Sequence, residues 1–130
     1  MLNGDIIPGI ADENYVKDNY NLLSIRTGGE IIGWLAYYSA YHGKDTAYLS
    51  LLYIKKSHRV SGFGTEIIDA LTLCLAESNY SAIKLHCSLR NALALRFWVK
   101  NGFDRITDVE CDGNLTQGKF GGLELMKKIT

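Results

Sequence analysis

The sequence predicts an α/β fold in a single domain over residues 1–130: a mixed, mostly antiparallel sheet with a parallel strand-helix-strand core. Two observations predict it. Short runs of apolar, β-branched and aromatic residues alternate with two stretches of helical periodicity, and turn signals join the remaining runs as hairpins. A chain of 130 residues is also long enough for one hydrophobic core and too short for two of ordinary size.

The first confident elements are two strands joined as a hairpin. Residues 22–26 and 31–38 are apolar, and the Thr-Gly-Gly-Glu turn between them supplies the positive φ angles that a tight hairpin needs. Residues 10–20 are mostly polar and predict at most one weakly amphipathic helix, so the N-terminal helical region is short.

The centre of the chain predicts a buried strand followed by a helix. Residues 46–54 read TAYLSLLYI, a nearly continuous apolar run that is typical of a strand covered on both faces. Apolar side chains then recur every four positions from Phe63 to Leu75. This spacing predicts a helix over residues 63–78, which Asn79 can end in the left-handed conformation.

A second strand and helix follow, and then a closing antiparallel pair. Residues 82–88 alternate as a strand, and residues 91–102 predict a helix with Asn91 at its N-cap and Gly102 just beyond its end. The last pair is predicted at residues 104–111 and 122–129. The sheet is therefore expected to be parallel where the first helix crosses over and antiparallel elsewhere.

The composition excludes several classes of function. Fourteen cationic and fourteen anionic side chains cancel, so no overall field favours nucleic acid or an anionic membrane. No apolar run approaches the roughly 20 residues that span a bilayer, and the three cysteines suggest neither a disulfide framework nor a zinc site. We expect a cytoplasmic protein that binds no nucleic acid, membrane or metal.

Residues 54–68, which read IKKSHRVSGFGTEII, predict an anion site made of backbone. A strand that runs through a glycine-rich turn into a helix leaves several N–H groups unpaired at the positive end of the helix dipole. We expect Gly62 and Gly64 to leave room for a phosphate. Positive charge could come from Lys55, Lys56, His58 and Arg59.

A second motif, NALALRFWVKNGF at residues 91–103, follows after one predicted helix and one predicted strand. Together the two motifs resemble the signature of the GNAT superfamily of acetyl-CoA-dependent N-acetyltransferases. That family has V-x-P-x-x-R-G-x-G-x-G, which falls on residues 54–64, and N-x-x-A-x-x-F-Y-E-K-x-G-F, which falls on residues 91–103. The similar core runs from about Tyr48 to Phe103.

The resemblance implies a GNAT fold that takes acetyl-CoA or coenzyme A as a cosubstrate, without a metal. The pantetheine arm would lie beside the central strand, and Asn91 would touch it, cap its own helix, or do both. The diphosphate would sit on the amides of Arg59 to Thr65 in the glycine-rich turn. The implied cofactor-binding residues are Leu52, Tyr53, Ile54, Arg59, Val60, Ser61, Gly62, Phe63, Gly64, Thr65, Asn91 and Trp98.

The chain departs from the family at the residue that protonates the leaving thiolate. Trp98 stands where the family usually has a tyrosine, and an indole N–H donates a hydrogen bond but releases no proton near neutral pH. Water could protonate the thiolate instead. Trp98 would then either pack against the pantetheine or acetyl group, or serve as an ordinary core aromatic.

The group that accepts the amine proton is also not obvious. Many family members place a glutamate on or beside the central strand, whereas residues 46–54 contain no carboxylate. Tyr48 and His86 are the catalytic candidates, with Asp45 as a further one, although a strand histidine more often makes ordinary hydrogen bonds. Cys87 offers a covalent route as the less usual alternative.

Three functions remain open from the sequence. The first is an N-acetyltransferase that acts on a primary amine of a small molecule or peptide. The second is a GNAT-like domain that binds coenzyme A or an acyl-CoA as a sensor or partner-binding module. The third is a small α/β domain whose turn binds nothing in particular.

Two surface features bear on partners. A shortened N-terminal region would leave an aromatic patch of Trp34, Tyr37, Tyr38 and Tyr41 bare, and we expect a homodimer to cover it. The acidic residues of the last hairpin could attract a cationic amine or simply be solvated. They are Asp108, Glu110 and Asp112.

Overall fold

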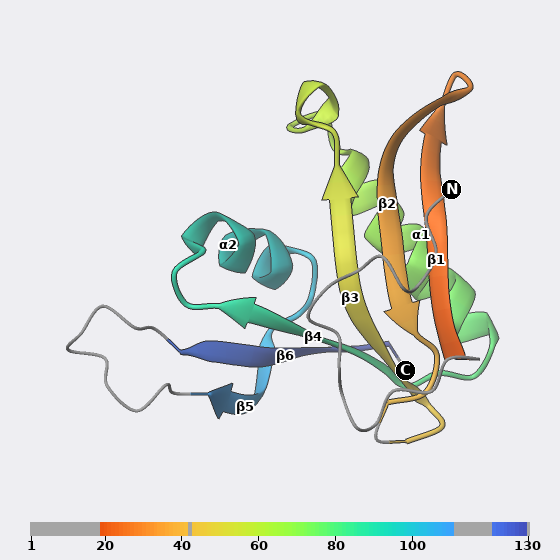
Figure 1. Cartoon of the computed structure of the whole chain (residues 1–130). Helices are drawn as coiled ribbons and strands as arrows, with labels where there is room; N and C mark the ends of the chain where they lie inside the picture. The colour runs from red at the N-terminus through yellow and green to blue at the C-terminus, as the bar shows by residue number, and fades with distance from the viewer. Residues whose placement is uncertain (1–18, 42, 111–120, 130) are drawn as a thin grey trace.

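The computed structural model describes residues 19–41, 43–110 and 121–129, which form one six-stranded sheet with two helices (Figure 1). The strand order is β1-β2-β3-β4-β6-β5. In chain order the elements are β1 (Tyr20–Thr27), β2 (Glu30–Tyr38), β3 (Thr46–Ile54), a 3₁₀ turn (Lys56–His58), α1 (Phe63–Glu77), β4 (Ala82–Ser88), α2 (Ala92–Lys100), β5 (Arg105–Glu110) and β6 (Gly122–Lys128).

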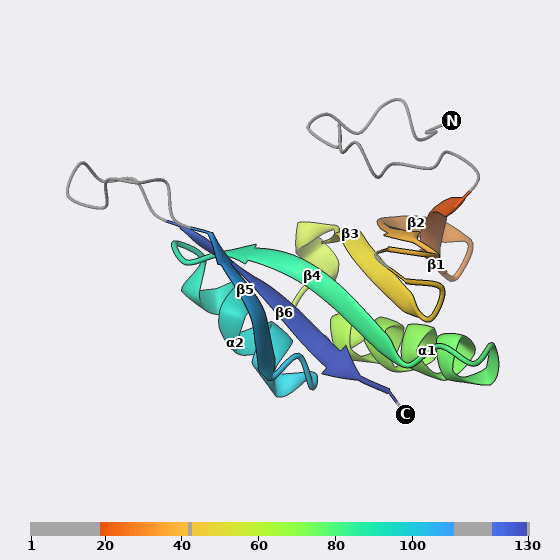
Figure 2. The same ribbon diagram turned by 90° about the horizontal axis from the view of Figure 1, so that it is seen from below.

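The predicted mixed sheet is confirmed. β3 and β4 are parallel and are joined through α1, and every other neighbouring pair is antiparallel. Both helices cover the same face of the sheet (Figure 2), where the main core lies. No helix within the described ranges is long and apolar enough to cross a bilayer.

The helix ends are where the sequence predicts them. Asn79 takes a left-handed φ of 68°, and Tyr80 N donates to Leu75 O at 3.0 Å just beyond α1. Gly102 has φ 96° after α2, and Phe103 N donates to Trp98 O at 2.9 Å. Each left-handed residue turns the chain away from its helix, so the next segment can pack back onto the sheet.

The two faces of β3 are buried to different depths. Ala47 and Leu49 are buried against the helices at 0% and 4% exposure, whereas Tyr48 and Ser50 on the other face are partly exposed. The reason is that both helices lie on one side of the sheet (Figure 2). A weak helix is predicted over residues 10–20. Residues 10–18 lie outside the described residues, and Tyr20 begins β1.

The expected bare aromatic patch does not exist in the described chain. Tyr38 is buried at 6% exposure, and Trp34, Tyr37 and Tyr41 are half-buried. Tyr37 is the cross-strand partner of Leu49 and packs against the core on the helix side, where burial raises the pKa of its phenol. The four side chains therefore do not share one exposed face.

Candidate functional site

A gap opens between β3 and β4 because their ladder stops early. The paired positions run from Thr46↔Ala82 to Leu49↔Leu85, although β3 continues to Ile54. From Ser50 to Ile54, the β3 backbone is therefore not paired with β4. An extended chain could add to the sheet here as an extra strand.

A β-bulge in β3, just after the end of the β3–β4 ladder, changes which side chains of β3 face the helices. Ala36 pairs with Leu51 and Tyr37 pairs with Leu49, so Ser50 is an extra residue in β3, and its Oγ donates to Ala36 O at 3.2 Å. The bulge shifts the alternation by one residue. Leu52 consequently packs against the helix-side core, whereas Tyr53 is 46% exposed.

A cavity of about 480 Å³ lies between the end of β3, the start of α1 and α2. Its walls combine apolar side chains with three that can carry positive charge. The lining residues are Leu52, Ile54, His58, Arg59, Val60, Gly62, Gly64, Thr65, Ala94, Phe97, Trp98 and Lys100. A cavity of this size accommodates part of a small-molecule ligand that is apolar over one stretch and anionic over another.

Backbone donors are available at the cavity. Among the described residues, the N–H groups of residues 60–65 donate to no protein acceptor, and the first helical bond runs from Glu66 N to Gly62 O at 3.1 Å. Val60 and Gly62 take φ angles of 66° and 84°. No heavy atom lies within 4 Å of a Cβ placed on Gly62, so the loop is open above its amides. This arrangement suits an anion.

One detail of the expected loop is wrong. The amide of Arg59 is not free, because it donates to Lys56 O at 3.3 Å within the 3₁₀ turn. Gly64 lines the cavity and also has a packing role. A Cβ at Gly64 would lie 2.9 Å from Phe97 Cζ, where α2 crosses the start of α1.

The cations are distributed differently from the expectation. Lys55 Nζ lies 2.8 Å from Glu30 Oε2, and this hydrogen bond holds the pKa of Glu30 below its usual range. Arg59 Nε donates to Ile54 O at 2.7 Å, and its guanidinium lies 5.4 Å from the centre of the Tyr53 ring. Positive charge at the cavity is therefore supplied by Arg59 and Lys100, and His58 lies beside them in the wall.

Comparison with known proteins places this geometry in a family. The model of the Acetyltransferase (GNAT) family matches residues 6–103. The chain belongs to the GNAT acetyltransferase family. No curated protein matches the chain in sequence.

Solved structures of GNAT enzymes share the fold at low sequence identity. The Escherichia coli ribosomal-protein-S18-alanine N-acetyltransferase has a TM-score of 0.74 at 16% identity, covering 87% of this chain and 71% of that one. A GNAT family acetyltransferase from Elizabethkingia anophelis with acetyl-CoA bound gives 0.72 at 18% identity, covering 85% and 77%. A spermidine N-acetyltransferase chimera from Vibrio cholerae and hSSAT gives 0.70 at 16% identity, covering 86% and 71%.

The GNAT signature residues divide between the cavity and other positions. Eight predicted cofactor residues line the cavity: Leu52, Ile54, Arg59, Val60, Gly62, Gly64, Thr65 and Trp98. Tyr53, Ser61, Phe63 and Asn91 do not. Asn91 caps α2, since its Oδ1 accepts from Ala94 N at 3.0 Å.

His58, named from the sequence as a possible source of charge, lines the cavity, whereas three further lining residues were missed: Ala94, Phe97 and Lys100. A signal for these three was present. Ala94, Phe97 and Lys100 follow each other at three-residue spacing, which puts them on one side of α2. Trp98 lines the cavity and also packs edge-on against Phe97 and Phe103, with ring centres 4.9 and 5.4 Å away. Trp98 is therefore a core aromatic that also borders the cavity, and its contact with a pantetheine or acetyl group stays a prediction.

The catalytic candidates lie away from the cavity lining. The Tyr48 ring packs 4.4 Å from the Tyr41 ring, centre to centre, and 6.4 Å from that of Tyr38. His86 lies on β4, where its Nε2 is 3.2 Å from Glu110 Oε2. Both belong to the sheet face that the helices leave open.

The two remaining candidates have structural positions. Asp45 precedes β3, and its carboxylate accepts from Ser81 Oγ while its backbone oxygen accepts from Ser81 N at 2.8 Å. It therefore lies at the opposite end of β3 from the open amides of residues 60–65. Cys87 is part of the core, and burial raises the pKa of its thiol, which disfavours a nucleophilic thiolate.

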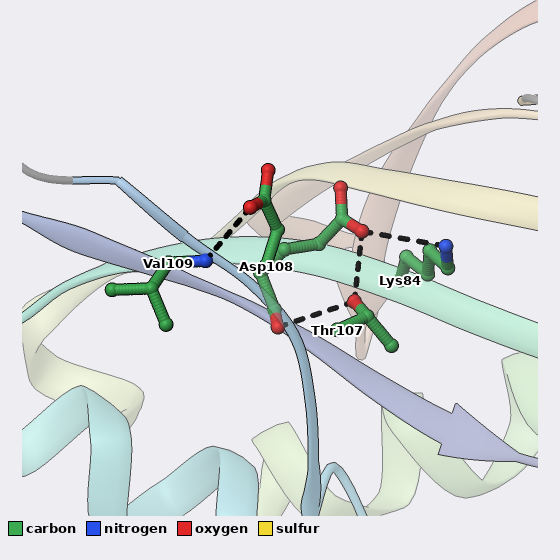
Figure 3. A network of polar contacts seen from close by, with 5 residues as sticks. Lys84, Thr107, Asp108 and Val109 are labelled. Carbon is green, nitrogen blue, oxygen red and sulfur yellow. Dashed lines mark hydrogen bonds and ion pairs between the residues drawn. The ribbon is translucent and has the colours of Figure 1, made fainter.

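The open face carries a polar network on β4, β5 and β6 (Figure 3). Lys84 Nζ lies 3.3 Å from Glu124 Oε1, and Thr107 Oγ1 donates to the same oxygen at 2.8 Å. Asp108 Oδ1 accepts from Val109 N at 2.9 Å. Of the three acidic residues considered for a cationic amine, Asp108 thus has a local backbone partner, Glu110 pairs with His86, and Asp112 lies outside the described residues.

Proposed function

We propose that this GNAT protein is an N-acetyltransferase that moves the acetyl group of acetyl-CoA to a primary amine of a small molecule or peptide. The observation that carries the proposal is the row of open amides at residues 60–65 beside a cavity with apolar and cationic walls. The acetyl-CoA bound to the Elizabethkingia anophelis enzyme supports the choice of donor.

The donor is proposed to lie along the gap beyond the β3–β4 ladder. Its diphosphate would accept from the amides of residues 60–65, with Lys100 and His58 supplying charge. Its pantetheine amides would pair with the backbone of residues 52–54, as an added strand pairs with a sheet edge. Trp98 would then form the wall beside the pantetheine or acetyl group.

Transfer is proposed to proceed by direct attack of the amine on the thioester. A thiol whose pKa is like that of cysteine, about 8.5, leaves readily as thiolate. Proton donation by the residue at the tyrosine position is not required, and water can protonate the thiolate. The buried Cys87 thiol makes a covalent acetyl-cysteine route the weaker candidate.

The acceptor class is tested with a panel of amines. The similar enzymes include one named for a ribosomal-protein alanine and one for spermidine, which are a peptide and a polyamine substrate. Release of coenzyme A from acetyl-CoA should be measured with polyamines, amino acids, aminoglycosides and peptide N-termini. Turnover above the hydrolysis rate with at least one of them supports the proposal, and its absence with all of them contradicts it.

A second candidate function is a coenzyme A or acyl-CoA binding module without efficient catalysis. Trp98 in the cavity wall and the lack of a carboxylate on β3 favour it. Thermal denaturation with coenzyme A separates both candidates from a domain that binds nothing. A ligand at a hundred times its dissociation constant should stabilise the fold by roughly 2.7 kcal/mol. Binding without turnover on any amine would support the module.

Three further assignments stay predictions: one domain over residues 1–130, a cytoplasmic location and a homodimer. The homodimer has lost its original basis, because the aromatic side chains expected to be bare are buried or half-buried. Sedimentation at micromolar concentration tests it, and a monodisperse monomer would count against it.

A further inference from the structure

Two side chains of the open face meet across a strand that separates them. His86 lies on β4 and Glu110 on β5, and β6 runs between these strands. His86 Nε2 nevertheless lies 3.2 Å from Glu110 Oε2. The contact therefore requires that β6 present almost no side chain at this level.

Gly122 on β6 meets that requirement. It is the cross-strand partner of Ser88 on β4 and of Glu110 on β5. A Cβ at Gly122 would lie 2.2 Å from His86 Nε2 and 2.5 Å from His86 Cε1, so the imidazole occupies the space of the missing side chain. Gly122 does not have a positive φ, so this contact, and not the backbone angle, demands glycine.

We propose that His86, held by Glu110 over Gly122, accepts the proton of the acceptor amine. The inference rests on the proposed N-acetyltransferase function and identifies the proton acceptor that β3 lacks. A carboxylate can only accept, so the neutral imidazole carries its hydrogen on Nε2 and keeps the lone pair of Nδ1 for the amine. Glu110 is then a positioning residue that fixes the tautomer.

The position of His86 along β4 fits this role. It follows Leu85, the last residue of the ladder with β3, so it is the first residue of β4 beyond the point where the strands separate. The side chains of His86 and Glu110 are 40% and 65% exposed, which leaves them accessible to an acceptor. The thioester of an acetyl-CoA molecule bound between β3 and β4 beyond their ladder would lie at the level of His86 along β4.

The other titratable and charged groups near His86 have partners of their own. Glu124, opposite His86 on β6, pairs with Lys84 of β4 and accepts from Thr107 of β5. Asp108 of β5 accepts from Val109 N, and Tyr48 of β3 packs against Tyr41. Glu110 is thus the carboxylate that contacts the imidazole among the described residues.

The proposed acetyl transfer conserves atoms and charge. An acceptor ammonium gives one proton to His86 Nδ1, and the freed lone pair forms the C–N bond to the acetyl carbonyl carbon. The C–S bond breaks and its electron pair leaves on the sulfur of coenzyme A. A second amine proton reaches that thiolate through water, and His86 releases its proton to solvent. The products are the amide, the free thiol and one proton.

The kinetic test uses the best amine of the panel and the full chain. His86→Gln keeps an amide that can bond to Glu110 but cannot accept a proton, so kcat/KM should fall on the order of a hundredfold. The acidic limb of the pH profile should disappear, and stabilisation by coenzyme A should be unchanged. Glu110→Gln should lower kcat about tenfold at an unchanged KM for acetyl-CoA, with Glu110→Asp recovering part of the loss.

The matched control is Glu124→Gln, which removes the other ion pair of the same face and should leave the pH profile intact. An active wild type with an unchanged His86→Gln profile would overturn the inference alone. A wild type that acetylates none of the amines would overturn the proposed function.

Nitrogen-15 NMR of the imidazole tests the pair independently of activity. The neutral ring of His86 should be protonated on Nε2 in the wild type and should lose that preference in Glu110→Ala. A ring protonated on Nδ1 in the wild type would overturn the inference, because no lone pair would then face the amine.

Discussion

Val60 is a β-branched residue with a left-handed backbone conformation. It takes φ 66° in the position where the GNAT signature has glycine, and its side chain is fully exposed. Left-handed backbone costs a side chain with a Cβ on the order of 1–2 kcal/mol. No packing offsets this cost, so the conformation serves the direction of the neighbouring amides.

Val60→Gly should therefore raise the free energy of unfolding by roughly 0.5–1 kcal/mol. The relief of left-handed strain, on the order of 1–2 kcal/mol, exceeds the extra chain entropy of glycine, about 0.5–1 kcal/mol. Urea denaturation measures the change, and Val60→Ile, which keeps the branched Cβ, should show no gain. A Val60→Gly variant less stable than the wild type would refute the strain argument.

Gly64 tests whether packing or phosphate explains a signature glycine. Gly64→Ala should lower the free energy of unfolding by about 1–3 kcal/mol, because the new Cβ would overlap Phe97. The double variant Gly64→Ala with Phe97→Leu should recover part of this loss, since the two sites are in contact. Full stability together with lost coenzyme A binding would instead assign Gly64 to the phosphate.

At the scale of elements, α2 contributes its N-cap to the fold and its inner face to the cavity. Asn91→Ala should lower the free energy of unfolding by about 1 kcal/mol, because Ala94 N loses its acceptor. Asn91→Asp keeps the cap and should keep the stability. Calorimetric titration of coenzyme A into both variants then reveals any contact to pantetheine, since a pure cap would leave the affinity of Asn91→Asp unchanged.

Element existence and order could be predicted from the sequence, whereas local register could not. The hairpin, the crossover helix and the helix ends at Asn79 and Gly102 follow from periodicity and turn chemistry. The bulge at Ser50 depends on pairing with β2, which no local pattern reports. For this reason the faces of Leu52 and Tyr53 could not be assigned in advance.

The candidate site shows the same division. The loop of open amides was predictable because residues 60–65 belong to one contiguous segment. The positions of Lys100 and of the His86–Glu110 pair depend on how distant segments pack, and the pair also needs Gly122 as an empty position on the strand between them. A single sequence does not show that His86, Glu110 and Gly122 lie side by side on three neighbouring strands.

In the whole molecule, the proposed donor and acceptor sites lie on opposite faces of the sheet. Both helices lie on one face (Figure 2), which holds the cavity and the open amides, and the other face holds the His86–Glu110 pair. The β3–β4 ladder ends at Leu49 and Leu85, and beyond this point the two strands are no longer paired. Donor and acceptor are thus expected to approach this point from opposite sides.

The central claim is that the amides of residues 60–65 bind the diphosphate of coenzyme A. Calorimetric titration of coenzyme A into the wild type, Gly62→Glu and Gly29→Glu tests it most directly. Gly29 is a matched control, with φ 85° against 84° for Gly62 and open space around a Cβ in both cases. We expect coenzyme A to bind to the wild type and to Gly29→Glu, and not to bind to a folded Gly62→Glu. Equal binding to all three proteins would contradict it.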